Sequence, residues 1–105
     1  MELHTHKEIE NTLQQFINQA LSVTYTQWDS EEADEEEVID FNGTLKEVRI
    51  TDNEFEEKDL FLLFTGDDGE IELLMEVPAS EEDLGVLEGN QLRIFGTEAE
   101  IILIK

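Results

Sequence analysis

The sequence predicts an α+β fold, in which an amino-terminal helix packs on or beside a five- or six-stranded antiparallel, barrel-like sheet. Three observations lead to this prediction. Apolar residues recur at helical intervals near the amino terminus, later segments are alternately or continuously apolar over strand lengths, and turn residues separate those segments. Because 105 residues leave room for one hydrophobic core, we expect a single domain over residues 1–105.

The predicted helix covers residues 6–21. Thr5 and Glu8 have the spacing of a capping box, which satisfies backbone N–H groups at a helix start. Residues 22–28 follow, and their β-branched and aromatic content predicts a strand, although Tyr25 and Trp28 would also continue the helical stripe. The apolar positions of that stripe are Ile9, Leu13, Phe16, Ile17, Ala20 and Leu21.

Residues 29–37 form an acidic segment with almost nothing apolar to bury. Eight of the twelve residues from 29 to 40 are Asp or Glu. Such a stretch is typical of a solvated loop, because it offers no apolar area to offset the entropy of ordering. We therefore expect a loop that separates the helical region from a strand-rich barrel over residues 38–105.

Five strands are predicted in that second region. In the first, the apolar positions up to Leu45 share one parity whereas Val48 and Ile50 take the other, so we expect a bulge near Lys46 and Glu47. A long strand bent in this way can serve two sheets. The remaining predicted elements are a central strand at 60–64, a strand at 70–77, a short helical turn at 80–87, and strands at 92–95 and 101–104.

Three turn-rich stretches are similar to those of a known superfamily. They are Asn42-Gly43-Thr44-Leu45, the hairpin from Thr65 to Ile71, and the entry to the next strand from Glu88 to Gly96. With the strand order, this pattern resembles an OB-fold over residues 38–105, and an SH3-like barrel or a helix packed on an open sheet would give a similar pattern. The resemblance implies binding of single-stranded nucleic acid on a basic, aromatic face. A ligand face of that kind would use Lys46, Arg49, Arg93 and Phe95.

Charge is the feature of the composition that bears on partners. Twenty-eight Asp and Glu face six Lys and Arg, a formal net charge of -22. This field repels phosphate and anionic lipid and attracts cationic surfaces, so we expect a basic protein surface as partner, no direct nucleic acid and no membrane. The absence of Cys and of any apolar run of membrane-spanning length favours a cytoplasmic protein. The oligomeric state stays open.

No catalytic or metal-binding motif is present, so we expect a non-enzyme without cofactor. The three Ser residues have no His in a predicted core element to activate them, and the glycines match neither a P-loop nor a dinucleotide fingerprint. An EF-hand that began at Asp29 would need Gly where Asp34 stands. His4 and His6 could point the same way on an extended terminus, but no third ligand lies near them in sequence.

The main functional hypothesis is therefore a non-catalytic interaction module, a regulator or inhibitor that engages a basic, nucleic-acid-binding protein surface. Carboxylates at strand spacing could imitate a row of phosphates, and an aromatic side chain beside them could supply affinity. The alternative is an OB-like domain that binds oligonucleotide or another ligand on a locally neutral face. The candidate partner-binding residues are Trp28, Asp29, Glu31, Glu32, Asp34, Glu35, Glu36, Glu37, Glu70, Glu72 and Glu76.

Overall fold

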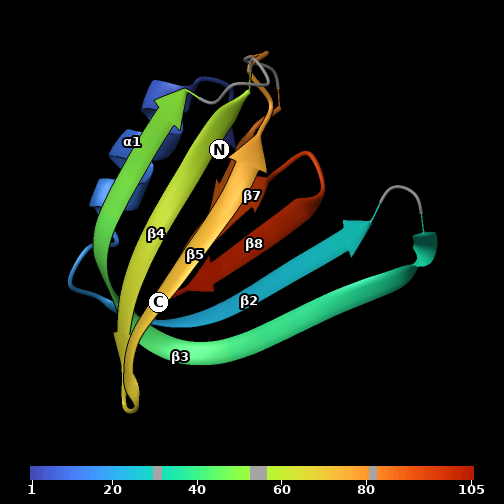
Figure 1. Cartoon of the computed structure of the whole chain (residues 1–105). Coiled ribbons are helices and arrows are strands. Elements are labelled where there is room, and N and C mark those ends of the chain that lie inside the picture. The colour runs from blue at the N-terminus through green and yellow to red at the C-terminus, as the bar shows by residue number, and fades with distance from the viewer. Residues whose placement is uncertain (30–31, 53–56, 81–82) are drawn as a thin grey trace.

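The computed structural model describes residues 1–29, 32–52, 57–80 and 83–105, and for residues 29 and 32–35 it describes the backbone. Eight strands form one antiparallel sheet in the order β1-β6-β7-β8-β2-β3-β4-β5, with one helix beside it (Figure 1). The elements are β1 (Glu2–Leu3), α1 (His6–Gln14), β2 (Ala20–Asp29), β3 (Glu32–Asp52), β4 (Lys58–Gly66), β5 (Gly69–Val77), β6 (Gly85–Glu88), β7 (Gln91–Phe95) and β8 (Ala99–Ile104).

The expectation of an α+β, five- or six-stranded, barrel-like fold was wrong. The protein is mostly β, and its sheet is open, with β1 at one end of the strand order and β5 at the other. A barrel requires its first and last strands to pair. Here β1 has two residues and pairs with β6, while β5 pairs with β4. The sheet therefore keeps a long edge at β5.

The bend in β3 was predicted correctly and determines how the sheet folds. Residues up to Thr44 pair with β2, and residues from Thr44 onward pair with β4, with a register shift between Leu45 and Glu47. Leu45 and Val48 are both buried although one has an odd number and the other an even number. The shift therefore changes which set of alternate residues faces the core. One strand thus joins a half-sheet of β1, β6, β7, β8 and β2 to a half-sheet of β4 and β5.

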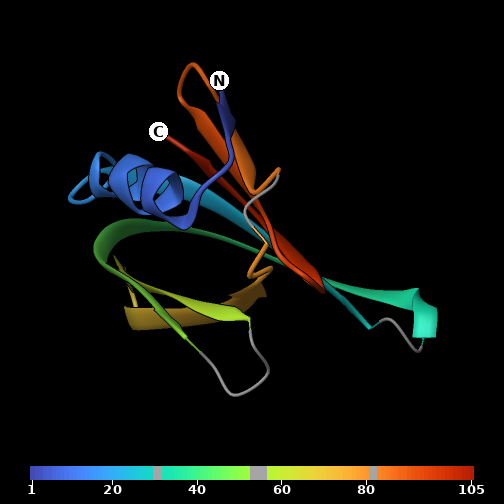
Figure 2. The same cartoon turned by 90° about the horizontal axis from the view of Figure 1, so that it is seen from above.

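Helix α1 closes the open side between the two half-sheets. In Figure 2 it lies between the orange-to-red strands β6 to β8 and the yellow strands β4 and β5. Its capping box is present as predicted: the Thr5 side chain accepts from the Glu8 N–H, and the Glu8 carboxylate accepts from the Thr5 N–H. Its buried face carries Ile9, Thr12 and Leu13.

The helix ends seven residues earlier than the predicted boundary at residue 21. Asn18 has a φ of 68°, a left-handed conformation that breaks the helix, and its N–H donates to the Leu45 carbonyl at 2.8 Å. From Ala20 onward the chain pairs with both β3 and β8, which buries Leu21 and Val23. Strand pairing therefore overrides the helical stripe that continued into this segment.

The prediction of a loop over residues 29–37 was also wrong for the part that the structure describes. Residues 32–37 belong to β3, and Glu32, Glu36 and Glu37 pair with the end of β2 across a register shift. Figure 1 shows this hairpin projecting past the end of β8. Because Glu36 and Glu37 are exposed although they point to opposite faces, the strand forms here without burying charge. We call residues 26–29 and 32–40 the acidic arm.

The short helical turn predicted at 80–87 is replaced by a strand in its second half. Gly85 begins β6, which pairs with β1 on one side and β7 on the other. A Cβ atom at Gly85 would lie 2.7 Å from the Arg93 carbonyl oxygen and 3.0 Å from Cδ1 of Ile9. The glycine thus allows β6 to lie close to both β7 and the helix. The pattern of apolar residues along the sequence does not predict this contact.

Candidate functional site

The acidic arm places aromatic, aliphatic and acidic side chains on one outer sheet face. Trp28 is half-buried and stands directly opposite Glu36 in the β2–β3 ladder. Val38 stands opposite Thr26, so it is a diagonal neighbour of Trp28 on the same face, and 53% of it is exposed. Glu100 is the partner of Thr26 on the β8 side. Trp28 and Val38 therefore form an apolar pair between carboxylates.

Tyr25 and Trp28 have different environments because they differ in parity. Tyr25 is on the core face, with 6% of its surface exposed, whereas Trp28 is on the outer face. Trp28 therefore does not share the buried environment of Tyr25. Burial raises the pKa of the Tyr25 hydroxyl above its usual value.

The structure separates the predicted acidic residues into two groups. Glu36 and Glu37 are exposed on the acidic arm, together with Asp40. Glu70 and Glu72 are exposed on the outer face of β5, while Glu76 is half-buried and accepts a hydrogen bond from the Thr97 hydroxyl at 3.0 Å. Of the other candidates on the arm, the backbone of Asp29, Glu32, Asp34 and Glu35 lies in strands, and Glu31 is outside the described residues.

The alternative ligand face does not assemble. Arg93 and Phe95 share the outer face of β7, but β8 and β2 lie between that strand and β3, which carries Lys46 and Arg49. Arg93 Nε is 2.9 Å from a Glu100 carboxylate oxygen, and Arg49 pairs with Glu47 at 3.3 Å. A groove for single-stranded nucleic acid needs contiguous cations beside exposed aromatics. These four residues do not supply one.

Most of the cations are engaged within the chain. Besides Arg49 and Arg93, Lys58 forms an ion pair with Asp52, which lowers the pKa of that carboxyl group. The ammonium of Lys105 lies 4.5 Å from the centre of the Phe16 ring, and that of Lys46 donates to the Asn18 side chain at 3.4 Å. Where the structure describes burial, no Asp or Glu side chain is buried, so the carboxylates of that part of the chain remain on the surface.

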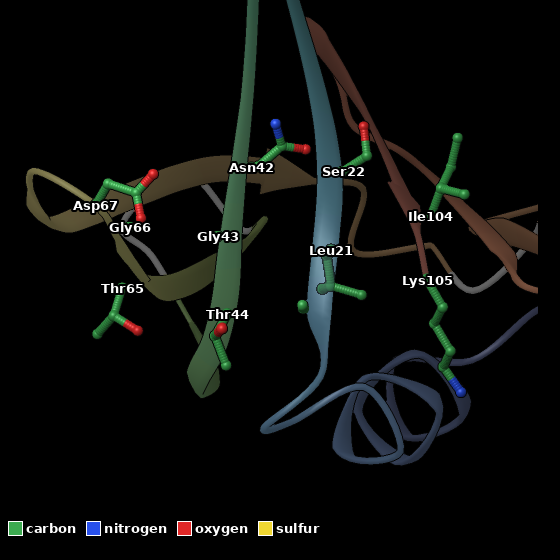
Figure 3. Close-up of a pocket in the computed structure, with 11 residues that line it drawn as sticks. Leu21, Ser22, Asn42, Gly43, Thr44, Thr65, Gly66, Asp67, Ile104 and Lys105 are labelled. Atoms are coloured by element: carbon green, nitrogen blue, oxygen red, sulfur yellow. The ribbon is translucent and has the colours of Figure 1, made fainter.

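A pocket of about 460 Å³ lies where β2 begins and β3 bends (Figure 3). Its lining includes the polar side chains of Ser22, Asn42, Thr44, Thr65 and Asp67, and Figure 3 shows the Lys105 side chain directed toward the helix instead. Ligand pockets are mostly apolar and aromatic. Because the described residues lining this one include no aromatic side chain, its composition does not indicate a small-molecule site.

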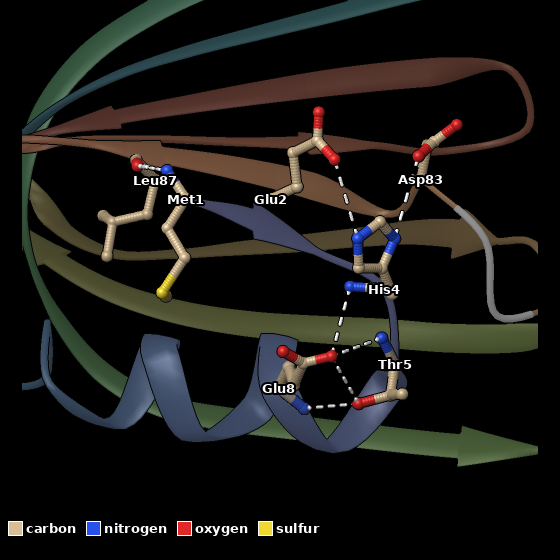
Figure 4. Close-up of polar contacts among 7 residues, drawn as sticks. All are labelled: Met1, Glu2, His4, Thr5, Glu8, Asp83 and Leu87. Atoms are coloured by element: carbon tan, nitrogen blue, oxygen red, sulfur yellow. Dashed lines mark hydrogen bonds and ion pairs between the residues drawn. The ribbon is translucent and has the colours of Figure 1, made fainter.

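The two histidines do not form a metal pair. The His4 imidazole lies between two carboxylates, 3.6 Å from Glu2 and 3.7 Å from Asp83 (Figure 4). The ring of His6 instead has its Nε2 atom 2.8 Å from the Pro78 carbonyl oxygen. Among residues 1–29, 32–52, 57–80 and 83–105, no cluster of three or more His, Asp or Glu suits a metal ion.

The amino terminus is attached to β6 by backbone contacts. In Figure 4 the Met1 amino group donates to the Leu87 carbonyl at 2.7 Å. The N–H of Leu87 returns a bond to the Met1 carbonyl at 2.8 Å, and the N–H of Leu84 donates to Leu3 at 3.0 Å. These contacts complete the short β1 edge of the sheet.

Sequence reasoning missed three exposed aliphatic residues: Val38, Ile39 and Leu74, at 53%, 47% and 61% exposure. Leu74 had a detectable signal, because it occupies an outward position in a strand whose other outward positions are Glu. Val38 and Ile39 had none, since their exposure follows from the arm projecting past the strands that would cover it. No helix in the described part of the chain is both long and apolar enough to cross a membrane.

Comparisons with known proteins identify no relative. No protein-family model matches the chain, and neither the curated proteins nor the solved structures contain a significant match.

Proposed function

We propose that this chain is a non-catalytic, acidic interaction module that engages a basic protein surface, with the acidic arm as its main contact. The observation that supports the proposal is the exposure of Val38 and Ile39 on a hairpin surrounded by carboxylates. Aliphatic side chains left in water among charges are typical of a surface that a partner covers. Regulation or inhibition of a nucleic-acid-binding protein is the process that this chemistry fits best.

The two kinds of side chain on the arm would have different tasks. Trp28 and Val38 would supply affinity by leaving water, because buried aromatic residues dominate most protein interfaces. Glu36, Glu37 and Asp40 would accelerate association with a cationic surface and reject anionic ones. The net charge of -22 extends this attraction, and physiological salt screens it over roughly 8 Å.

The test is affinity capture from a cell lysate at low salt, followed by measurement of Kd for the purified partner at several salt concentrations. The arm variant carries Glu36→Gln and Glu37→Gln. Its matched control carries Glu10→Gln and Glu88→Gln, which removes the same charge from exposed positions on α1 and β6. A third variant, Val38→Ser, removes the aliphatic contact while the arm charge is kept.

We expect the affinity of the wild-type chain to fall steeply with salt. The arm variant and Val38→Ser should each lose roughly tenfold in affinity, whereas the matched control should lose less than about threefold. A partner that stays bound in high salt would contradict the proposal, as would equal losses in the arm variant and its control.

A further inference from the structure

Strand β5 has an edge that no other strand in the described part of the chain pairs with, and its outward backbone groups can be identified. It ends the strand order and pairs with β4 on one side. At its far end, the Thr97 N–H donates to the Glu76 carbonyl at 3.0 Å, so the backbone groups of Glu76 face away from β4. Backbone direction alternates along an antiparallel strand. The N–H and C=O groups of Glu70, Glu72 and Leu74 therefore face the same open side.

The turn between β7 and β8 limits the open part of this edge. A Cβ atom at Gly96 would lie 2.6 Å from the Glu76 carbonyl oxygen and 2.7 Å from Cε of Met75. The turn is thus in close contact with β5 at residues 75 and 76. Because the Thr97 N–H already donates to the Glu76 carbonyl there, residues 70–74 are the stretch left for another strand.

Apolar side chains border the open stretch on the core side. Ile71 and Leu73 are half-buried at the edge of the core. At the Ile71 end of the open stretch, a depression of about 330 Å³ is lined by Phe41 and Ile71 among others. At the Leu74 end, another of about 170 Å³ is lined by Tyr25 and Leu74 among others. Alternate side chains of an added strand would cover these residues.

The outer side of the same stretch is acidic. Glu70 and Glu72 are exposed there, and Asp67 and Asp68 are exposed in the adjoining turn. The described residues that line the two depressions include five acidic ones and no Lys or Arg: Asp67, Asp68, Glu70, Glu76 and Glu98. An added strand with Lys or Arg at alternate positions would therefore place its cations beside these carboxylates.

We propose that residues 70–74 of β5 accept an extended segment of a basic partner protein as a ninth strand, with cationic side chains on its outer face and aliphatic ones on its core face. This inference rests on the proposed function, since it specifies how a basic partner binds. Two copies of this chain would pair poorly here, because antiparallel β5 edges would bring Glu70 and Glu72 close to the same residues of the other copy.

The probe is an eight-residue, end-blocked peptide in which Lys and Val alternate. Two control peptides have the same side chains and carry N-methyl groups at every second backbone nitrogen, one at the odd positions and the other at the even positions. In one of the two, every N–H that would face β5 is therefore replaced. Binding is followed by fluorescence anisotropy, and amide hydrogen exchange of Glu72 and Leu74 is followed by NMR. We expect the peptide to slow exchange at both amides by at least about tenfold at saturation and the methylated form to bind roughly tenfold more weakly.

Two variants separate the backbone from the charge. Glu72→Pro removes an N–H that faces away from β4, so the β4–β5 ladder keeps its bonds while the added strand loses a donor. Glu72→Gln removes the charge alone. We expect roughly tenfold weaker binding for Glu72→Pro and about a twofold loss for Glu72→Gln, with circular dichroism confirming that both variants fold.

The outcomes distinguish this inference from the proposed function. Equal binding of the methylated and unmethylated peptides, or unchanged exchange at Glu72 and Leu74, would overturn strand addition while leaving a salt-dependent interaction through the acidic arm intact. Dimerisation in sedimentation experiments with protection of the same amides would also overturn it in favour of self-pairing. Absence of peptide binding at low salt would refute strand addition, and the lysate experiment would still test the acidic arm.

Discussion

The two phenylalanines of β4 should differ sharply in their contribution to stability. Phe64 faces the core, with 0% exposure, and its ring meets that of Phe41 edge-to-face with centroids 5.2 Å apart. Phe61, three residues earlier, faces outward, and the Arg49 guanidinium lies 4.9 Å from its ring centre. Substituting each by Ala therefore tests which face of β4 is buried.

The expected magnitudes follow from these environments. A core Phe→Ala substitution destabilises by about 3–5 kcal/mol, because it removes buried area and leaves a cavity. For half-buried Phe61 the lost burial is about 1 kcal/mol and the cation–π contact adds about 0.5–1 kcal/mol, so about 1–2 kcal/mol is expected. The free energy of unfolding should thus fall by about 2–3 kcal/mol more in Phe64→Ala than in Phe61→Ala.

Urea denaturation followed by circular dichroism measures this difference, provided that the slope m is unchanged between variants. If Phe64→Ala does not fold, the comparison is made with Leu at both positions: Phe64→Leu keeps most of the volume and should cost less than about 1.5 kcal/mol, and Phe61→Leu should cost less than Phe64→Leu. Equal losses at the two positions, or a larger loss at Phe61, would refute the assignment of faces and with it the core described above.

Two further predictions concern the helix start and the buried tyrosine. Thr5→Ala should lower the free energy of unfolding by about 1 kcal/mol in denaturant titrations, because it removes the acceptor for the Glu8 N–H, whereas Thr5→Ser should keep most of the stability. Burial raises the pKa of Tyr25, so above about pH 10 the unfolded chain ionises at this residue before the folded one does. Stability is therefore lost as pH rises through the folded pKa, and melting temperatures measured from pH 9 upward should fall more steeply for the wild type than for Tyr25→Phe. Parallel pH curves would show that the hydroxyl is not protected by folding.

Local patterns in the sequence determined several features directly. The capping box of Thr5 and Glu8 and the bend near Lys46 were predicted from residue type and parity, because caps and bulges depend on neighbours a few positions away. In β5, Glu76 stands between Met75 and Val77 in the sequence, and this alternation matches the burial of the two apolar residues, which are 4% exposed. The charge of the chain, and the class of partner proposed from it, also come from composition alone.

Only the tertiary structure decided which faces and edges are open. The run from Leu60 to Phe64 is apolar on both parities, so its buried face depended on where β3 and β5 place their own side chains. Glu36 and Glu37 lie in a strand because β2 pairs with them, and residues 85–88 became a strand between β1 and β7. These outcomes depend on partners far away in sequence, which local propensity does not contain. The same long-range pairing leaves β5 at the end of an open sheet, where the carboxylates of Glu70 and Glu72 stand beside backbone groups that no described strand pairs with.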